Sequence, residues 1–282
     1  MAVKRETCIQ FIDQEGRGEH LSLRGEIMKN KIKGFAKEIG TDDVGIAAIA
    51  DYQSPRSPSI EKLFPEAKSI VVLAFRELSN CESPSPQIAM SGRLDLMDFL
   101  RRSSYRMARF LETDCGAKAM TVPATFPMEM SRETKGLVAD LSLRHAAVAA
   151  GLGVFGRNNL VYHPRFKNRV IFSAVLTDLG LESDPPAQGE SCSRCNRCVE
   201  HCPAGALHEE GKTDVMKCMR TLEPYGLGAS IQFWTKLMDA SPEEKKVLLR
   251  DVEYWRLYHV LQMGFQYLCF NCMKSCPDMQ KM

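Results

Sequence analysis

The chain of 282 residues is long enough for one large domain or two ordinary ones. Its hydrophobic content of 44% and charged content of 26% are those of a globular protein and exclude a disordered or fibrous chain. A formal net charge of +2 excludes a strong overall attraction to nucleic acid or to an anionic membrane. The sequence shows neither a signal peptide nor an apolar run of about 18 residues, so we expect a cytoplasmic protein.

Helical and strand patterns alternate along the front part of the chain, which predicts one α/β layered domain. Residues 1–22 show no periodicity and are predicted to be irregular, and residues 81–86 to be a turn-rich loop. A short helix is also predicted to start at Ser57, which is a suitable cap. The other predicted helices cover residues 25–40, 94–113 and 137–150, and the predicted strands cover residues 44–50, 69–75, 117–122 and 169–176.

The stretch from Leu181 to Gly189 is acidic, carries two adjacent prolines and ends in glycine, so it is predicted to be a linker. It divides the chain into a front domain over residues 1–182 and a cysteine-rich domain over residues 183–282.

A helical insert is predicted inside the cysteine-rich domain. Ser241 and Glu244 have the spacing of a capping box and predict the start of a helix that runs to about Met263. We expect Trp234 and Trp255 to form the core of this insert.

Two cysteine runs have the spacing of iron–sulfur ligands. The first, C-x2-C-x2-C-x3-C-P over residues 192–203, is the bacterial ferredoxin pattern, in which three thiolates hold one [4Fe-4S] cluster and the fourth binds another. The second run, over residues 269–277, repeats only C-x2-C-x3-C-P, with Gln266 where its first cysteine would stand. Cys218 is the substitute ligand that we expect.

Crossed ligation between two such runs predicts two complete ligand sets. A structural zinc site is the alternative, because paired C-x2-C motifs often bind zinc, but zinc has no use for the Cys-Pro that ends each run. Cys8, Cys81 and Cys115 have no ligand spacing and are expected to be ordinary free thiols. One predicted set is Cys192, Cys195, Cys198 and Cys276, and the other is Cys202, Cys218, Cys269 and Cys272.

The front domain needs its own explanation, because two clusters alone would make a ferredoxin of far fewer residues. A large front domain implies that the electrons are used inside the same chain. Its cofactor motifs are weak: residues 151–156 match G-x-G-x-x-G, but a predicted helix precedes them where a dinucleotide site has a strand. The sequence contains no Walker loop and no H-E-x-x-H.

The sequence RHAA at residues 144–147, followed by AGLGVFGRNNL at residues 150–160, resembles the epoxyqueuosine reductases. Their core motif is A-G-L-G-(W/V)-(I/F)-G-(K/R)-N-x-L, and the respiratory reductive dehalogenases are their relatives. The resemblance covers the chain from about residue 137 to its C-terminus. The segments that follow in the family's order are LTDL at 176–179, the ferredoxin run, MKCM around Cys218 and CFNC at 269–272.

The resemblance implies a nitroreductase-like α/β domain that holds base-off cobalamin, followed by a ferredoxin-like domain with two [4Fe-4S] clusters. Electrons from a low-potential donor of the ferredoxin or flavodoxin type would pass through the clusters to the corrin, where a small substrate is reduced. The glycine-rich loop would lie against the corrin, because glycines let the backbone approach closely. The expected cobalamin contacts are Gly151, Gly153, Gly156, Arg157, Asn158, Val161 and Arg165.

The chain departs from the reductases in two respects. Their catalytic aspartate, the presumed proton donor, aligns with Leu137, which has no proton to give, and Asp140 lies one turn further on. Tyr162 is a second candidate donor, because a tyrosine serves in the dehalogenases, and His145 is a third. The sequence also stops at Met282 without the helical-repeat domain of members that act on tRNA, so we expect no tRNA substrate.

Three hypotheses therefore remain open. The chain is a cobalamin-dependent reductase of a small substrate, or it is an electron-transfer protein that reduces the corrinoid of a partner protein and needs no acid residue. The third hypothesis is a two-cluster ferredoxin whose front domain only docks a partner.

Overall fold

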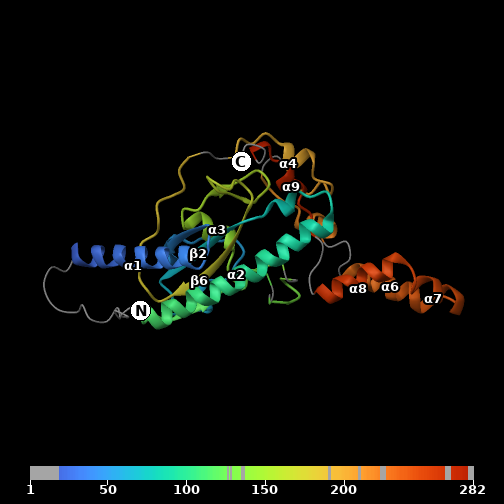
Figure 1. Cartoon of the computed structure of the whole chain (residues 1–282), viewed down its shortest axis with the longest axis horizontal. Coiled ribbons are helices and arrows are strands. Elements are labelled where there is room, and N and C mark those ends of the chain that lie inside the picture. The colour runs from blue at the N-terminus through green and yellow to red at the C-terminus, as the bar shows by residue number, and fades with distance from the viewer. Residues whose placement is uncertain are drawn as a thin grey trace, which may run out of the picture.

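The computed structural model describes residues 19–125, 127, 129–134, 137–189, 192–208, 211–222, 227–263 and 268–278. The predictions for Cys8 and Gln266 concern residues outside these ranges. Helices and strands alternate as predicted and form a mixed α/β body, from which an arm of three helices projects (Figure 1). Within the described ranges, no helix combines the length and the apolar character that crossing a membrane requires.

A four-stranded antiparallel sheet forms the centre of the body. Its strand order is β1-β2-β6-β3, and β2 pairs with β6 over the full length of both strands. Seven of the eight residues of β2 are buried, because helices and loops cover both faces of the sheet. The strands are β1 (Asp43–Ala48), β2 (Ser69–Arg76), β3 (Ala119–Thr121) and β6 (Val170–Thr177), and each coincides with a predicted strand to within a few residues.

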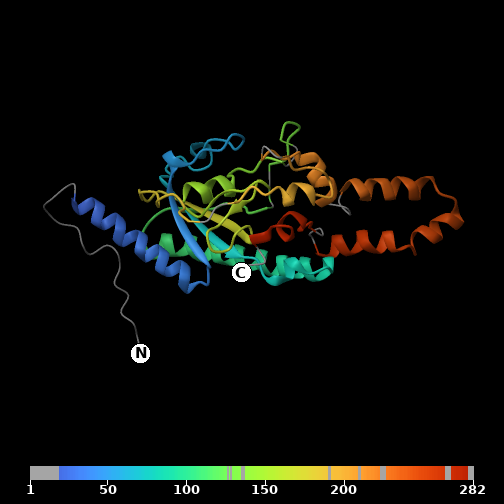
Figure 2. The same ribbon diagram turned by 90° about the horizontal axis from the view of Figure 1, so that it is seen from above.

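Two hydrophobic clusters cover the two faces of the sheet. On one face, α1 (Glu19–Glu38) and α2 (Pro86–Asp114) bury side chains such as Ile32 and Leu100 against the strands. On the other face, α3 (Leu143–Ala149) contacts β1, β2 and β6. Figure 2 shows α2 and α3 on opposite sides of the sheet. The α3 side carries the cavity described below.

Several helices have limits that differ from their predictions. α1 begins at Glu19, so the end of the predicted irregular segment is helical, and α2 begins at Pro86. α2 starts early because Ser85 is its N-cap: the Ser85 hydroxyl accepts a hydrogen bond from the Ile88 N–H, and proline suits the first helical turn. The other two predicted helices are shorter, residues 143–149 instead of 137–150 and a 3-10 turn at residues 60–62 after Ser57.

The predicted linker is packed against the body over its first half. Leu181 is buried in the cluster beneath α1. The Asp184 carboxylate accepts a hydrogen bond from the Ile46 N–H at 2.9 Å and pairs with Lys29 at 3.0 Å and Lys33 at 2.8 Å. Because β1 lies at the edge of the sheet, this segment covers hydrogen-bonding groups that would otherwise be open. The domain division between residues 182 and 183 stays a prediction.

The cysteine-rich segment consists of short helices joined by loops. α4 (Arg197–Glu200) contacts α9 (Asn271–Lys274), so the two cysteine runs lie side by side. Between α5 (Val215–Leu222) and α9, the chain forms the projecting arm (Figures 1 and 2). The helices of the arm are α6 (Leu227–Asp239), α7 (Pro242–Leu248) and α8 (Val252–Met263).

The arm corrects two predictions. The capping box of Ser241 and Glu244 forms as predicted, but α7 ends at Leu248, and α8 starts afresh instead of continuing one helix to residue 263. The prediction that Trp234 and Trp255 form a core is wrong, since they are 46% and 52% exposed. Two antiparallel helices cover only one side of each other, so the opposite sides stay in solvent.

Candidate functional site

A cavity of about 630 Å³ opens between the α3 side of the sheet and the cysteine-rich segment. This volume is within the usual range for cofactor and ligand pockets, about 300–1,000 Å³. Residues 54–57, 123–125, 137–139 and 141–145 contribute loops and the start of α3, and β6 contributes Phe172 to the apolar wall. The cysteine-rich segment contributes Thr213, Val215 and Met273.

The polar side chains of the cavity carry positive charge. Arg56, Arg93 and Arg144 line it, together with His145. None of the lining residues that the structure describes is an aspartate, glutamate, tyrosine, lysine or cysteine. The cavity therefore favours a ligand with negative charge or with hydrogen-bond acceptors such as amide and phosphate oxygens.

Arg93 is held in place by a buried ion pair. Its guanidinium contacts Glu77, which is only 2% exposed just after β2, and lies 5.2 Å from the ring centre of Phe270. Burial raises the pKa of the Glu77 carboxyl, and the cations of Arg93 and Arg169 act in the opposite direction. This pair ties α2 and the end of β2 to the residue next to Cys269.

His145 is the candidate catalytic residue that lines the cavity. Its Nδ1 lies 2.7 Å from the Ser142 hydroxyl, and its ring packs 4.9 Å from that of Phe155. Burial and the neighbouring Arg144 cation lower the pKa of His145 below its ordinary value of 6.5. The imidazole is therefore mostly neutral at pH 7, and its protonated form, which can donate a proton, becomes abundant only in more acidic solution.

The other two candidate acids lie elsewhere. Tyr162 is 2% exposed and donates a hydrogen bond to the Asp278 carboxylate at 2.8 Å, beside the cavity of the first cysteine set. Asp140 is not among the described residues that line the main cavity, although Leu137, Val138 and Ala139 before it are. The structure thus brings one of the three candidates to this cavity.

The three glycines of the predicted corrin loop pack against the chain itself. The segment forms a small hairpin of β4 (Val154–Phe155) and β5 (Val161–Tyr162), which the sequence does not predict. A Cβ on Gly151, which has a positive φ of 70°, would meet the Pro185 carbonyl oxygen at 2.1 Å, and one on Gly153 would meet the Tyr162 carbonyl at 2.5 Å. Gly151 and Gly153 can pack this closely only because they have no side chain.

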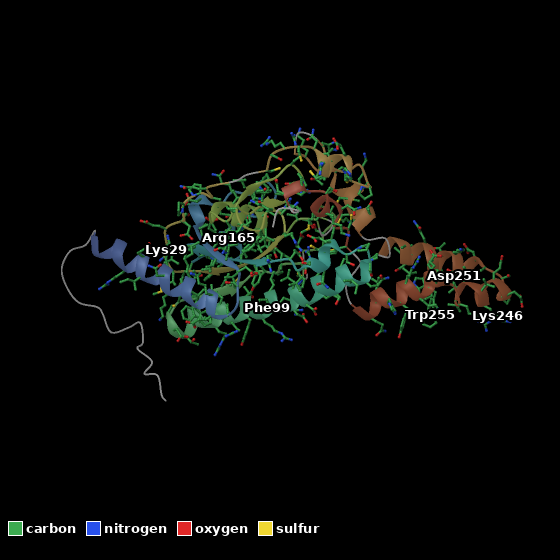
Figure 3. The ribbon with its side chains drawn as sticks, turned by 45° about the horizontal axis from the view of Figure 1, so that its top comes forward. Lys29, Phe99, Arg165, Lys246, Asp251 and Trp255 are labelled. Atoms are coloured by element: carbon green, nitrogen blue, oxygen red, sulfur yellow. The ribbon has the colours of Figure 1, made fainter. Side chains whose placement is uncertain are left out.

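The remaining expected cobalamin contacts are divided among several places. Val161 lines the main cavity, whereas Gly156, Arg157 and Asn158 lie beside the first cysteine set, and Asn158 also lines the cavity of the second set. Arg165 lies on the surface of the body, where it pairs with Asp43 at 3.2 Å (Figure 3). Arg93 and Asn168 also line the main cavity, but neither belongs to a motif, so the sequence analysis did not identify them.

The eight predicted cluster cysteines line two separate small cavities. The grouping in space is the same as the two ligand sets predicted from crossed ligation, although contact with iron is not itself observed. One cavity is lined by Cys192, Cys195, Cys198 and Cys276, and the other by Cys202, Cys218, Cys269 and Cys272.

The thiols in each cavity are close together, and seven of the eight cysteines are at least partly buried, Cys195 being the exposed one. Burial, with the neighbouring thiols of Cys269 and Cys218, raises the pKa of Cys272 to about 12, and burial also raises the pKa of Cys198 and Cys276. A positively charged iron core would offset this cost of forming thiolates. In the part of the chain that the structure describes, no three His, Cys, Asp or Glu side chains are grouped closely enough to hold a single metal ion.

The two cysteine cavities differ in their relation to the main cavity. The one with Cys202 shares five lining residues with it, whereas the one with Cys192 shares only Asn168 among the described residues. Backbone N–H groups approach sulfur in both, from Arg157 to Cys192 at 3.5 Å and from Ala206 to Cys202 at 3.3 Å. The five shared residues are Arg144, Asn159, Leu160, Thr213 and Val215.

These features define a mixed α/β protein with two cysteine-lined sites beside a cavity of cofactor size. The family of 4Fe-4S binding domains matches residues 189–208. Epoxyqueuosine reductase of Bacillus subtilis (strain 168) is 24% identical over 284 residues, which cover 89% of this chain and 63% of that protein. Epoxyqueuosine reductase of Listeria monocytogenes is 37% identical over 145 residues, which cover 51% and 31%.

Solved structures show the same relationship in the fold. A selenomethionine-labelled epoxyqueuosine reductase superposes with a TM-score of 0.58 at 20% identity, over 91% of this chain and 66% of that one. A reductive dehalogenase, whose structure suggests a mechanism for B12-dependent dehalogenation, gives a TM-score of 0.53 at 19% identity, over 77% and 31%. The chain is thus a distant homologue of epoxyqueuosine reductases with a fold similar to that of reductive dehalogenases. It spans less than two thirds of the length of the curated relatives it matches.

Proposed function

We propose that this chain is an iron–sulfur reductase that uses a corrinoid in the main cavity. The observation that carries the proposal is the arrangement of cavities: two cysteine quartets, one of which shares a wall with a cofactor-sized pocket. In this proposal the front part of the chain is a nitroreductase-like domain and the cysteine-rich part is a ferredoxin-like domain. The match of the 4Fe-4S binding domain family to residues 189–208 supports the second assignment.

The two quartets are the proposed ligands of two [4Fe-4S] clusters. Electrons enter at the cluster of Cys192, Cys195, Cys198 and Cys276, since Cys195 is exposed, and continue to the cluster of Cys202, Cys218, Cys269 and Cys272. The second cluster is the one beside the main cavity. The proposed electron donor is a low-potential protein of the ferredoxin or flavodoxin type.

The lining of the main cavity fits a corrinoid. Its apolar wall, which includes Val161 and Phe172, suits the ring, and Asn168, Ser142 and Thr213 offer hydrogen-bonding groups for amide arms. The Asn168 side-chain oxygen is buried without a hydrogen-bond partner among the described residues, so it is available to an amide N–H of a ligand. When bound, a corrinoid supplies a strongly reducing cobalt centre, and the chain supplies orientation, exclusion of water and a proton.

The proposed proton source is His145. Ser142 fixes the orientation of its ring, and burial together with the Arg144 cation keeps it neutral until the solution is acidic or negative charge arrives nearby. The proposed substrate is a small molecule that reaches the open side of the cavity. One relative was solved with an epoxyqueuosine-modified tRNA stem loop, so a substrate screen includes such a stem loop as a comparison.

Reconstitution without oxygen tests the proposal. We expect about eight irons per chain, the content of two [4Fe-4S] clusters, and uptake of one cobalamin with a base-off cobalt(II) EPR signal. Thr125→Trp fills the cavity and is expected to reduce cobalamin uptake while iron content stays the same. Met130→Trp is the matched control, because Met130 is 74% exposed in the same loop region. Zinc in place of iron, or no uptake of cobalamin by the native chain, would reject the proposal.

A second candidate function is reduction of a corrinoid held by a partner protein. It is favoured by Leu137, which lines the cavity where the reductases are expected to carry their aspartate. In that case the chain reduces an added corrinoid protein catalytically, and His145→Gln leaves the rate unchanged.

A further inference from the structure

The helical arm exposes an apolar face that the body does not cover. On α6 this face consists of Ile231, Trp234 and Met238, and on α8 of Trp255 and Tyr258, each between 41% and 70% exposed. We call these five residues the arm face. The contact between the two helices uses other residues, such as Phe233, Leu257 and Val260, which are at most 9% exposed.

The two halves of the arm face lie on the same side of the hairpin. Phe233 of α6 and Tyr254 of α8 meet across the helix contact, with ring centres 6.0 Å apart. Trp234 and Trp255 each follow one of these residues by one position. Successive side chains of an α-helix point about 100° apart around the helix axis. Because α6 and α8 run antiparallel, this rotation places both tryptophans on the same side of the hairpin. Figure 3 shows Trp255 on the arm, away from the body.

The charge of the arm permits two copies to approach. Between residues 227 and 263 there are five basic and five acidic residues, so the arm has no net charge at neutral histidine. A neutral apolar face gives no electrostatic preference for a polyanion or for an anionic membrane surface. Figure 1 shows the arm extending beyond the body, which lets two arms lie together without the bodies colliding.

The area of the arm face is enough for a weak dimer. If a fully exposed side chain of this size presents roughly 200 Å², the five residues together present roughly 500 Å². Two such faces bury roughly 1,000 Å² in total, which is the lower limit for a specific interface. Two antiparallel helix pairs that meet on their apolar sides form a four-helix bundle.

We propose that the arm face binds the arm face of a second copy of this chain, so that the two hairpins form a four-helix bundle. The contact is isologous, with the same residues buried on both copies. The pairs of clusters and the main cavities stay on the two separate bodies, so the proposal is independent of the proposed function.

Sedimentation velocity of the anaerobically purified, iron-loaded chain tests this proposal. We expect a monomer that converts to a dimer as concentration rises. The chain has two tryptophans, and both lie in the arm face, so their fluorescence should shift to shorter wavelength and become protected from acrylamide over the same concentration range. The double variant Ile231→Glu and Met238→Glu keeps both tryptophans and should raise the dimer dissociation constant at least about a hundredfold. Ile27→Glu is the control, since Ile27 is 60% exposed on α1.

Iron content and cluster absorbance show that each variant is folded. The proposal is overturned if the native chain stays monomeric at every concentration, or if the double variant dimerises as well as the native chain. It is also overturned if a dimer forms while both tryptophans remain open to acrylamide. Binding to neutral lipid vesicles without self-association would assign the arm face to a membrane surface instead.

Discussion

The crossed arrangement of cysteines makes a prediction that separates it from a simple sequential one. Cys202 belongs to the first run in sequence, but it lies in the cavity of Cys218, Cys269 and Cys272. Replacing Cys202 by alanine should therefore damage the cluster beside the main cavity and leave the more exposed cluster intact. About four of the eight irons should be lost. Cys276→Ala should do the opposite and spare the cluster beside the main cavity.

The measurement compares variants in pairs, so it does not depend on the absolute yield of reconstitution. Iron and sulfide per chain, the EPR spectrum of the reduced cluster and its reduction potential are recorded for each variant. Cys202→Ala should match Cys218→Ala, and Cys276→Ala should match Cys195→Ala. If Cys202→Ala matches Cys195→Ala instead, the ligands are not shared crosswise and the order of the two clusters along the electron path is wrong.

Three further predictions concern the body and the main cavity. Asp184→Asn leaves the buried ammonium of Lys29 without its counter-ion, which costs about 3 kcal/mol and lowers the melting temperature by roughly 6–12 °C, while exposed Glu182→Gln should have no effect. Turnover should rise as the solution becomes more acidic, because burial and the Arg144 cation lower the pKa of His145 below its ordinary value of 6.5, so that its protonated form becomes abundant only at low pH. His145→Gln should flatten this pH profile, and a profile unchanged in the variant would exclude His145 as the donor. Gly151→Ala places a methyl group against the Pro185 carbonyl at positive φ and should cost about 1–3 kcal/mol in a melting experiment without changing cobalamin affinity; a loss of affinity at unchanged stability would restore the corrin-contact role of this glycine.

The sheet and the cysteine groups could be predicted because their signals are local. The residues of β2 form an unbroken apolar run, and a strand buried on both faces needs such a run. The cysteines are spaced so that one short loop presents three sulfurs, and this fixes their grouping almost without regard to the rest of the fold. Even the distant Cys218 falls in the expected cavity.

The direction of side chains in the glycine-rich segment could not be predicted. Val161 and Tyr162 are neighbours in β5, and successive residues of a strand point to opposite faces. Val161 therefore lines the main cavity and Tyr162 the cavity of the first cysteine set. A strand of two residues is too short to show an alternating pattern in its sequence. The sequence therefore does not indicate which of the two side chains faces which cavity.

Long-range pairs were also invisible in the sequence. Arg93 and Glu77 are brought together only when α2 packs beside the end of β2, and neither belongs to a motif. The prediction of the core of the arm was wrong for a different reason. Its helices carry apolar residues on two adjacent sides, so the pattern does not say which side faces the other helix. Trp234 and Trp255 belong to the outer side.

The position of Arg144 suggests why the proposed acid is held in its neutral form. Arg144 lines both the main cavity and the cavity of Cys202, so in the proposed function its cation would stabilise an added electron on either side. Burial, together with the same cation, lowers the pKa of His145. Added negative charge in the cavity offsets the effect of Arg144 and raises that pKa again, so proton uptake follows electron arrival instead of preceding it. Such coupling requires that the reduction potential of the loaded cavity fall as pH rises, and a potential that is independent of pH in the native chain would contradict it.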